Sequence, residues 1–392
     1  MSKLEQLIQE LCPDGVKYVI LGNICDITTG KLNANAMVED GDYPFFTCDA
    51  TPHRIDIYAF DTDAILISGN GSKVGHLHRY NGKFNAYQRT YVLDNFDAGI
   101  TKDFLYYFLE GFLKPYIIVN CKKGSVPYIT LPILQNFRIP VPPLEVQREI
   151  VRILDNFTEL TAELNKELSA RKSQYEFYRD YLLKFNSEIP RIRIKDICVL
   201  EKGKTAIQKA EPGEYHLVVT TSERKSCNNY QFDDAAVCIP LVSSRGHGVA
   251  SLNHVYYQEG KFALGNILCA AIPRDKKQLL AKYLFYYFEH TKDFTLVPLM
   301  KGGANVSMHL SDIEKVRIPV PPLAVQQRIV KVLDNFEAIC SDLSIGLPAE
   351  IEARKKQYEF YRENLLTFLE KGNTILTDRQ TDRQTDRQTD RA

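Results

Sequence analysis

A glycine-rich segment in the first half of the chain is followed by basic and amide side chains that could contact nucleic acid. The segment runs from Gly69 to Gly75 and reads GNGSKVG. Glycine lets a backbone approach a ligand closely, Lys and Arg neutralise phosphates, and Asn, Gln, Ser and Thr side chains hydrogen-bond to base edges. The candidate contacts in this half are Asn70, Ser72, Lys73, His76, His78, Arg79, Lys83, Gln88, Arg89, Lys122 and Lys123.

The second half contains a corresponding polar segment, Ser243-Ser244-Arg245-Gly246-His247-Gly248. Lys301 precedes glycine, as Lys123 does in the first half, so both lysines are candidates for phosphate contacts. The candidates in this half are Ser243, Ser244, Arg245, His247, Lys261 and Lys301, with Thr221, Arg224 and Lys225 as weaker ones. For any single residue, the alternative is an ordinary glycine turn with solvated charges.

Patterns that would indicate catalysis or cofactor binding are incomplete. Gly203-Lys204-Thr205 resembles the end of a phosphate-binding loop, but Cys198 stands where that motif requires glycine. The glycines after Gly69 have no βαβ unit around them, and His76-x-His78 has no evident third metal ligand. Neither an Asn-Pro-Pro-aromatic tetrapeptide nor a nucleophile elbow occurs. We therefore expect no active site, metal or cofactor in this chain.

Two long repeats must hold these polar segments in place. IPVPPLEVQREIVRILDNF (Ile139 to Phe157) returns as IPVPPLAVQQRIVKVLDNF (Ile318 to Phe336). RKSQYEFYRDYLLKF (Arg171 to Phe185) returns as RKKQYEFYRENLLTF (Arg354 to Phe368). The stretches between the repeats resemble each other only faintly, which favours two divergent modules on one common framework.

The repeats predict two long α-helices. After each Pro-Pro pair, apolar residues recur at steps of four and three, which is typical of a heptad seam in a helix of about 40 residues. To bury their seams the helices are expected to pack antiparallel, with the seam tyrosines in the core rather than on nucleic acid. Gly346-Leu347-Pro348 is expected to break or kink the second helix. The second seam contains Val325, Ile329, Val332, Phe336, Ile339, Leu343, Leu347, Ile351, Arg354, Tyr358, Tyr361, Leu365 and Phe368.

The modules between the helices are predicted to mix strands and helices. In the first module, strand-like runs occur at Tyr18–Leu21, Ala64–Ser68 and Thr90–Leu93, and a helical run at Phe104–Phe112. In the second, Lys282–Phe288 matches the helical run, and KGGANVSMHL matches KGSVPYITL of the first module. The two modules are therefore expected to share an α+β fold whose loops differ.

These repeats resemble the specificity (S) subunit of type I restriction–modification enzymes over about residues 1–370. The doubled IPVPPLxxQxxIVxxLDNF, the doubled RKxQYEFYRxxLL and the opening LCPDGVKYVILGNI carry the resemblance. It implies two α/β target-recognition domains, each reading half of a split DNA site, separated by an antiparallel coiled coil of two conserved helices that acts as a ruler. It also implies modification subunits, expected to number two, that bind S-adenosylmethionine, and a motor–nuclease subunit that requires ATP and Mg.

The expected architecture is a pseudo-twofold arrangement within one chain. The predicted segments are target-recognition domain 1 (1–143), conserved helix 1 (144–187), target-recognition domain 2 (188–322), conserved helix 2 (323–371) and a tail (372–392). The chain would direct adenine methylation or cleavage by its partners at an asymmetric bipartite DNA site. The alternatives are a coiled-coil scaffold that organises protein partners, and a self-sufficient enzyme with an unrecognised active site.

Composition agrees with a protein of the cytoplasm. The 392 residues contain 49 basic and 49 acidic side chains, so any DNA-binding surface must be local. The nine cysteines form no CxxC pair, and the N-terminus carries no signal peptide. The charges in the most apolar stretches argue against a membrane span.

The C-terminus is a tandem repeat, TDRQTDRQTDRQTDR followed by Ala392. Low hydrophobicity and alternating charge predict a disordered tail. A repeated ACAG tetranucleotide reads ACA-GAC-AGA-CAG, which encodes Thr-Asp-Arg-Gln. We therefore predict a phase-variable tract, in which the gain or loss of one unit shifts the reading frame. Synonymous codons that interrupt the tract would contradict this, and the alternative is simply a short charged tail.

Overall fold

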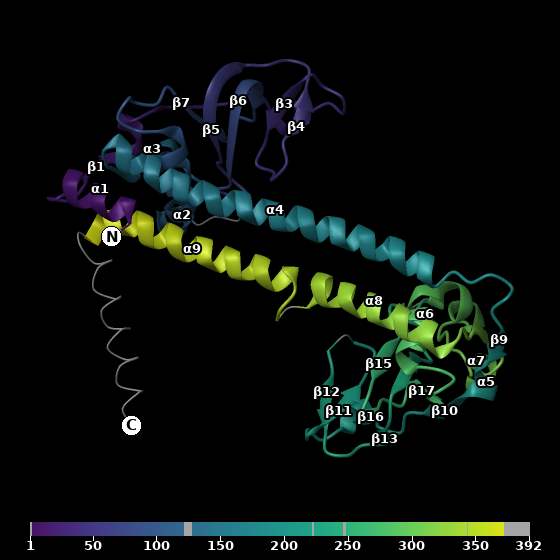
Figure 1. The fold of residues 1–392 in the computed structure, drawn as a ribbon. Coiled ribbons are helices and arrows are strands. Elements are labelled where there is room, and N and C mark those ends of the chain that lie inside the picture. Colours follow the sequence, from purple (N-terminus) through teal and green to yellow (C-terminus); the bar gives the residue numbers. More distant parts are fainter. Residues whose placement is uncertain (1, 121–127, 222, 246–247, 343, 372–392) are drawn as a thin grey trace, which may run out of the picture. The chain divides into compact units, whose positions relative to one another are not determined.

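The structure is a computed structural model that describes residues 2–120, 128–221, 223–245, 248–342 and 344–371, with side chains up to residue 366. The chain divides into two compact units (Figure 1). Unit 1 contains Met1–Glu163 and Ile351–Ala392, and unit 2 contains Leu164–Glu350. Each unit therefore combines one of the two modules with parts of the helices formed by the repeats. The predicted tail, 372–392, lies outside the described residues.

Unit 1 is built around a six-stranded sheet with the order β2-β7-β5-β6-β3-β4. Only β3 and β6 run parallel; the other neighbouring strands are antiparallel. The strands are β2 (Asp26–Thr29), β3 (Tyr43–Phe46), β4 (His53–Ile55), β5 (Phe60–Ser68), β6 (Leu77–Ala86) and β7 (Thr90–Asp94). A separate ladder joins β1 (Lys17–Ile20) to β8 (Arg138–Val141). The three strands predicted for this module are confirmed as β1, β5 and β7.

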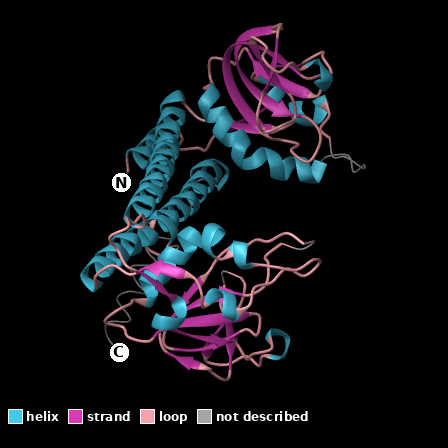
Figure 2. Ribbon diagram, turned by 90° about the vertical axis from the view of Figure 1, so that its right-hand side faces the viewer, coloured by secondary structure: helices cyan, strands magenta, loops and turns pink. Residues whose placement is uncertain are grey.

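The sheet of unit 1 is packed on both faces because β5 is apolar along most of its length. Ile65 and Ile67 face the main core with α2 (Lys102–Asn120), whereas Leu66 and Phe84 belong to a smaller core on the opposite face. This alternation follows from the two-residue period of a strand. Figure 2 shows α2 lying across one face of the sheet, and the predicted helical run lies within it. The remaining short helices are α1 (Lys3–Leu11), η1 (Leu21–Asn23), η2 (Ala34–Ala36) and α3 (Leu131–Gln135).

Unit 2 has related strand pairings divided between two four-stranded sheets, β10-β17-β14-β15 and β12-β11-β16-β13. A further ladder pairs β9 (Arg191–Arg193) with β18 (Arg317–Pro319). The other strands are β10 (Cys198–Lys202), β11 (Tyr215–Val218), β12 (Lys225–Cys227), β13 (Phe232–Asp233), β14 (Ala236–Pro240), β15 (Tyr256–Gln258), β16 (Lys261–Leu264) and β17 (Leu268–Pro273). The helices are α5 (Ile194–Ile197), η3 (Ile207–Lys209), α6 (Ala281–Thr295), η4 (Val297–Leu299) and α7 (Leu310–Ile313). The helical run predicted at Lys282–Phe288 lies within α6.

The repeats form three long helices: α4 (Leu144–Leu182), α8 (Leu323–Ser341) and α9 (Leu347–Lys371). In unit 1 the first part of α4 packs antiparallel to α9 (Figure 1). The ring centroids of Phe157 and Tyr361 lie 5.3 Å apart. In unit 2 the last part of α4 packs antiparallel to α8, with Tyr178 stacked on Phe336 at 5.6 Å. Each unit therefore contains an antiparallel helix pair, as predicted. The seam tyrosines contact seam residues but do not lie in the core, because Tyr178 is 38% exposed.

The second repeat departs from its predicted seam near its centre. The break expected at Gly346-Leu347-Pro348 is confirmed, because α8 ends at Ser341 and α9 begins at Leu347. A Cβ added to Gly346 would lie 2.5 Å from the carbonyl oxygen of Ala338, so the turn requires glycine. Two predicted seam residues were wrong: Val325 and Ile339 are 42% and 39% exposed. At the end of α8 the buried residue is Cys340 instead, because the helix terminates before the seam continues.

Candidate nucleic-acid interface

The glycine-rich segment of unit 1 forms the loop between β5 and β6. Gly69 is clamped between two segments: its amide donates to the carbonyl of Arg89 at 2.8 Å, and its carbonyl accepts from the amide of Ile129 at 2.9 Å. A Cβ at Gly69 would lie 2.3 Å from the Arg89 oxygen, which excludes any larger residue. Gly71 and Gly75 both have positive φ, at +86° and +81°. The loop is therefore a shaped turn whose tip exposes Ser72 and Lys73.

Three predicted residues gather beside this loop with a hairpin segment that the sequence analysis missed. The thiol of Cys48 donates to Oδ1 of Asn70 at 2.9 Å, and Nε2 of His78 lies 3.2 Å from the carbonyl oxygen of Asp49. The rings of His76 and His78 are 4.7 Å apart. Asn70, His76 and His78 thus converge on the β3–β4 hairpin.

The electrostatics of this cluster are set by burial and by local hydrogen bonds. Burial lowers the pKa of His78 below its ordinary value, which favours a neutral ring at pH 7. A hydrogen bond from His53 (3.0 Å), followed by one from Thr47, lowers the pKa of the Asp49 carboxyl. The cluster therefore offers neutral imidazole, amide and carboxylate groups, all of which can pair with base edges.

Other predicted residues of unit 1 lie elsewhere. Arg79 lies next to His78 on β6 but faces α2, where it pairs with Asp103 at 3.0 Å and covers the ring of Tyr106 at 4.2 Å. Lys83 lies 4.6 Å from the ring centroid of Tyr58. The side chain of Gln88 donates to Asn33 at 2.7 Å, and Arg89 is exposed beside the glycine loop. Lys122 and Lys123 lie outside the described residues.

Unit 2 builds a corresponding loop after β14. The amide of Ser243 donates to Val306 at 2.9 Å, and the amide of Met308 donates to Leu241 at 2.9 Å, so the loop packs against the turn that follows Lys301. The hydroxyl of Ser243 donates to the carbonyl of Val249 at 2.5 Å and accepts from the amide of Arg245 at 3.2 Å. The Ser244 hydroxyl accepts from the amide of Asn253 at 3.0 Å. The structure thus brings Ser243, Ser244, Arg245 and Lys301 together, whereas His247 lies outside the described residues.

Arg224 and Lys261 are separate from that loop. Nε of Arg224 donates to Gln258 at 3.1 Å and Nη2 to the carbonyl of Tyr257 at 3.2 Å. Burial lowers the Arg224 pKa, and the side chain lines a pocket of about 400 Å³ with Tyr256, Tyr257, Lys282 and Glu289. Lys261 lies 5.0 Å from the ring centroid of Tyr230. The hydroxyl of Thr221 donates to the carbonyl of Glu223 at 3.0 Å, and Lys225 is exposed.

The missed hairpin, Thr47–Pro52, corresponds to the β11–β12 loop that contains Thr221 and Arg224. Tyr43 pairs with Ile55 in unit 1 as Tyr215 pairs with Cys227 in unit 2. A signal was present in the sequence: GDY at 41–43 and GEY at 213–215 are each followed by a tyrosine at the same separation. Both tyrosine pairs are in contact, at 5.1 and 5.0 Å between ring centroids. An alignment of these tyrosine pairs would have matched the hairpin of the first module to that of the second.

Within the described part of the chain, no helix is both apolar and long enough to cross a bilayer. The same residues contain no group of three His, Cys, Asp or Glu side chains placed to hold a metal ion. The rings of His76 and His78 lie side by side, but Nε2 of His78 faces the backbone carbonyl oxygen of Asp49 and not a third ligand side chain.

Comparison with known proteins places the chain in one family. The family model described as "Type I restriction modification DNA specificity domain" matches residues 13–171 and 186–353. The type I restriction enzyme EcoDI specificity subunit of Escherichia coli is 37% identical, over 82% of this chain and 81% of the relative. A putative type I restriction enzyme specificity subunit of Haemophilus influenzae, S.HindORF215P, is 29% identical, over 84% and 89%.

A solved structure gives the same result at the level of the fold. The crystal structure of the type-I restriction-modification system S subunit from M. genitalium superposes with a TM-score of 0.55, at 16% identity, over 91% of this chain and 96% of that one. The two modules and the long helices of the repeats are therefore the fold of that subunit. The chain belongs to the type I restriction–modification DNA specificity family.

Proposed function

We propose that this chain gives a type I restriction–modification complex its sequence specificity by reading two unlike halves of one asymmetric DNA site. One observation carries the proposal: both units hold a loop against a later segment of the same module, with different side chains at matching positions. Asn70 bridges to Tyr128 in unit 1 as Val242 bridges to Ser307 in unit 2. Because side-chain donors and acceptors decide which base edge is favoured, two such surfaces would prefer different bases.

Within each surface we assign different roles to the loop tip and the loop base. Lys73 and Arg245 are exposed at matching positions, so the positive charge is retained, which suits a phosphate contact. Asn70, His76 and His78 are the proposed base-reading side chains of unit 1. The other proposed DNA contacts are Ser72, Lys83, Gln88, Arg89, Lys122, Lys123, Arg224, Ser243, Ser244, His247, Lys261 and Lys301, whereas Arg79 faces α2 and is no longer included.

The proposed partners are two modification subunits and one motor–nuclease subunit. S-adenosylmethionine, ATP and Mg would be bound by these partners, and adenine methylation or DNA cleavage would take place on them. An exposed phenylalanine that occurs in both repeats supports two copies of one partner. The matching residues Phe177 and Phe360 are 65% and 64% exposed, so each could contact one copy. This chain would contribute recognition and assembly without a catalytic group.

The conserved helices would set the separation between the two half-sites. α4 is a single helix whose first part belongs to unit 1 and whose last part belongs to unit 2. Four helical residues correspond to about 6 Å, the length of one to two base-pair steps of B-DNA. A change of helix length in steps of four would therefore alter the gap between half-sites while the apolar residues stay on the same face of the helix.

Selection of DNA by the assembled complex tests this function. The chain would be purified with its modification subunits and exposed to a random duplex library at several salt concentrations. We expect enrichment of one bipartite sequence with two unlike halves and an unread gap, bound more weakly as salt rises. Stable assembly without sequence enrichment would support the scaffold instead.

A further inference from the structure

A fully buried glutamine links the first module to the start of α4. Gln147 is 0% exposed although it belongs to a polar residue type. Its Oε1 accepts from the amide of Thr101 at 2.8 Å, and its Nε2 donates to the carbonyls of Gly99 at 2.8 Å and Pro142 at 2.7 Å. One side chain therefore joins three segments: the loop before α2, the Pro-Pro turn and α4.

The same link occurs in unit 2. Gln326, the matching residue of the second repeat, is also 0% exposed. Its Oε1 accepts from the amide of Leu280 at 2.9 Å, and its Nε2 donates to the carbonyls of Gln278 and Pro321, both at 2.8 Å. The geometry is repeated even though the loop sequences before α2 and α6 differ.

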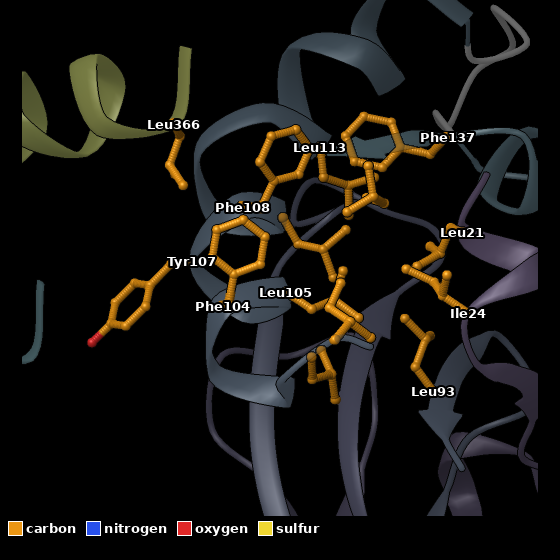
Figure 3. Close-up of a cluster of buried hydrophobic side chains, with 14 of the residues drawn as sticks. Leu21, Ile24, Leu93, Phe104, Leu105, Tyr107, Phe108, Leu113, Phe137 and Leu366 are labelled. Carbon is orange, nitrogen blue, oxygen red and sulfur yellow. The ribbon is translucent and has the colours of Figure 1, made fainter. Parts of the chain in front are cut away.

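A second link lies farther along each helix. The hydroxyl of Tyr107 on α2 donates to Oδ1 of Asp155 on α4 at 2.5 Å. In unit 2 the hydroxyl of Tyr286 on α6 is shared between Oδ1 of Asp334 at 2.6 Å and Oε2 of Glu337 at 2.7 Å, both on α8, and Asp334 also pairs with Lys282 at 3.1 Å. Figure 3 shows the Tyr107 hydroxyl pointing away from the core leucines and phenylalanines. Burial, followed by the hydrogen bond to Asp155, raises the Tyr107 pKa to about 12, so the phenol remains a donor.

Two links at separate points fix a helix more completely than one. Gln147 and Asp155 are eight residues apart, or about 12 Å along the helix axis. A single contact leaves a helix free to pivot, whereas two contacts determine both its tilt and its rotation against the module. A tilt of about 10° acting over roughly 20 Å would displace a DNA-contacting group by about 3.5 Å, close to the rise of one base pair.

We propose that Gln147 with Asp155, and Gln326 with Asp334, are positioning residues that determine how strictly the complex reads the gap between half-sites. This inference rests on the proposed function and assigns spacing specificity to the module–helix junctions as well as to helix length. The glutamine links are the same in both units, while the loops that would read bases differ. Loosening the links should relax the choice of gap and leave the preferred bases of each half-site unchanged.

The test uses the complex of the full chain with its modification subunits. In the Tyr107→Phe/Tyr286→Phe variant each ring remains and only the hydroxyl is lost. Binding is measured on duplexes with the native gap and with gaps one and two base pairs longer or shorter. We expect the preference for the native gap over its neighbours to fall about tenfold, which corresponds to about 1.4 kcal/mol. Discrimination against a changed base within a half-site should stay the same.

The matched control is Tyr116→Phe. Tyr116 also lies on α2, but its hydroxyl donates to the carbonyl of Ile133 at 3.0 Å, within the module. This variant should keep the native gap preference. In the Asp155→Asn/Asp334→Asn variant each hydroxyl still meets an accepting oxygen, but a neutral one, so the links are weakened and the gap preference should fall by less than in the phenylalanine variant.

An unchanged gap preference in both double variants would overturn the inference. So would an equal loss of base discrimination and gap preference, because that would indicate general damage rather than lost positioning. If the unaltered complex binds no bipartite site at all, the proposed function itself fails, and this outcome is distinct from the other two.

Discussion

The two units place different side chains where the sheet meets its covering helix. In unit 1 the cation is on the strand: Arg79 of β6 covers Tyr106 of α2 at 4.2 Å. In unit 2 it is on the helix: Lys282 of α6 lies 5.4 Å from the ring centroid of Tyr257 of β15. The matching strand positions are Arg79 and Tyr257, but the residue of α6 that matches Tyr106 is Phe285, whose ring centroid lies 6.2 Å from that of Tyr257. The cation–π contacts of the two units therefore use different helix positions. A pocket of about 400 Å³ lies beside the unit 2 arrangement, where a tyrosine replaces the longer arginine.

A second difference lies in the continuity of the sheets. In unit 1, β5 and β6 are long strands that hold all six strands in one sheet. In unit 2 the matching strands are interrupted, β13 from β14 at Asp234-Ala235 and β15 from β16 at Glu259-Gly260. Gly260 has φ +74° and accepts from the Asp234 amide at 3.2 Å, so the interruption is a turn. The module thus tolerates a divided sheet, whereas the glutamine links to α4 and α8 are the same in both units.

The largest expected effect comes from shortening α4 by one step of the seam. Deletion of Thr161–Leu164 removes four residues and leaves Leu160 and Leu168 at seam spacing. We expect loss of binding to the native site and gain of binding to the same half-sites with a gap shorter by one or two base pairs. The measurement is binding to a series of gap lengths, and retention of the native gap would contradict the ruler. Deletion of three residues instead, which breaks the seam, should impair folding.

Loss of a buried glutamine should destabilise either unit. Gln147→Leu leaves the Thr101 amide and the Gly99 and Pro142 carbonyls without their partner, at a cost of about 2–4 kcal/mol. Gln326→Leu should cost a similar amount in unit 2. Hydrogen exchange of peptides from α2 and α6 would locate each effect, with Gln88→Leu, an exposed residue, as the control. If the two leucine variants lost clearly different amounts of stability, the two junctions would not be equivalent.

Exchange of one loop residue should change one half-site only. Asn70→Val gives unit 1 the side chain found at the matching position of unit 2, Val242. We expect discrimination at one base pair to fall by about 1–3 kcal/mol, while the other half-site is read as before. Competition binding with single-base variants of both halves measures this. An equal loss at both halves would show that the two surfaces are not independent.

Removal of a loop-tip charge should weaken binding to all sequences alike. Lys73→Gln and Arg245→Gln are each expected to reduce the slope of log K against log salt by about 0.9, the value for one phosphate contact. Asp14→Asn, which alters a charge far from the loop in sequence, serves as the control. A change of sequence preference without a change of slope would indicate that these residues read bases instead.

The smallest expected effect is an acid sensitivity at the contact between α1 and α4 in unit 1. Arg152, followed by Lys3, lowers the pKa of the Glu149 carboxyl to about 2, and Glu149 is only 4% exposed. Because the folded-state pKa is depressed, this contribution is complete above about pH 4.5 and is lost as pH falls toward 2. Unit 2 has the exposed Arg328 at the matching position. Hydrogen exchange in peptides from α1 should therefore become faster as the pH falls from about 4.5 toward 2. In the Glu149→Gln variant this exchange should already be faster at neutral pH.

The sequence predicted the helices well because their signal is periodic. The steps of four and three located α4, and the glycine–proline segment located the break before α9. Buried glutamines were not predicted, since hydrophobic periodicity does not detect a polar residue that satisfies backbone groups. Grouping His78 with Arg79 as neighbouring contacts ignored the two-residue period of a strand, which places them on opposite faces. The hairpin at Thr47–Pro52 was missed because its partners are distant in sequence.

The most direct test of the account is a map of methylated adenines in the source genome, with this gene present and with it deleted. Two unlike recognition surfaces held by conserved helices predict one asymmetric motif, consisting of two short half-sites around an unread gap, that disappears on deletion. Methylation that is unchanged by the deletion, or lost from a motif without two separate halves, would contradict it.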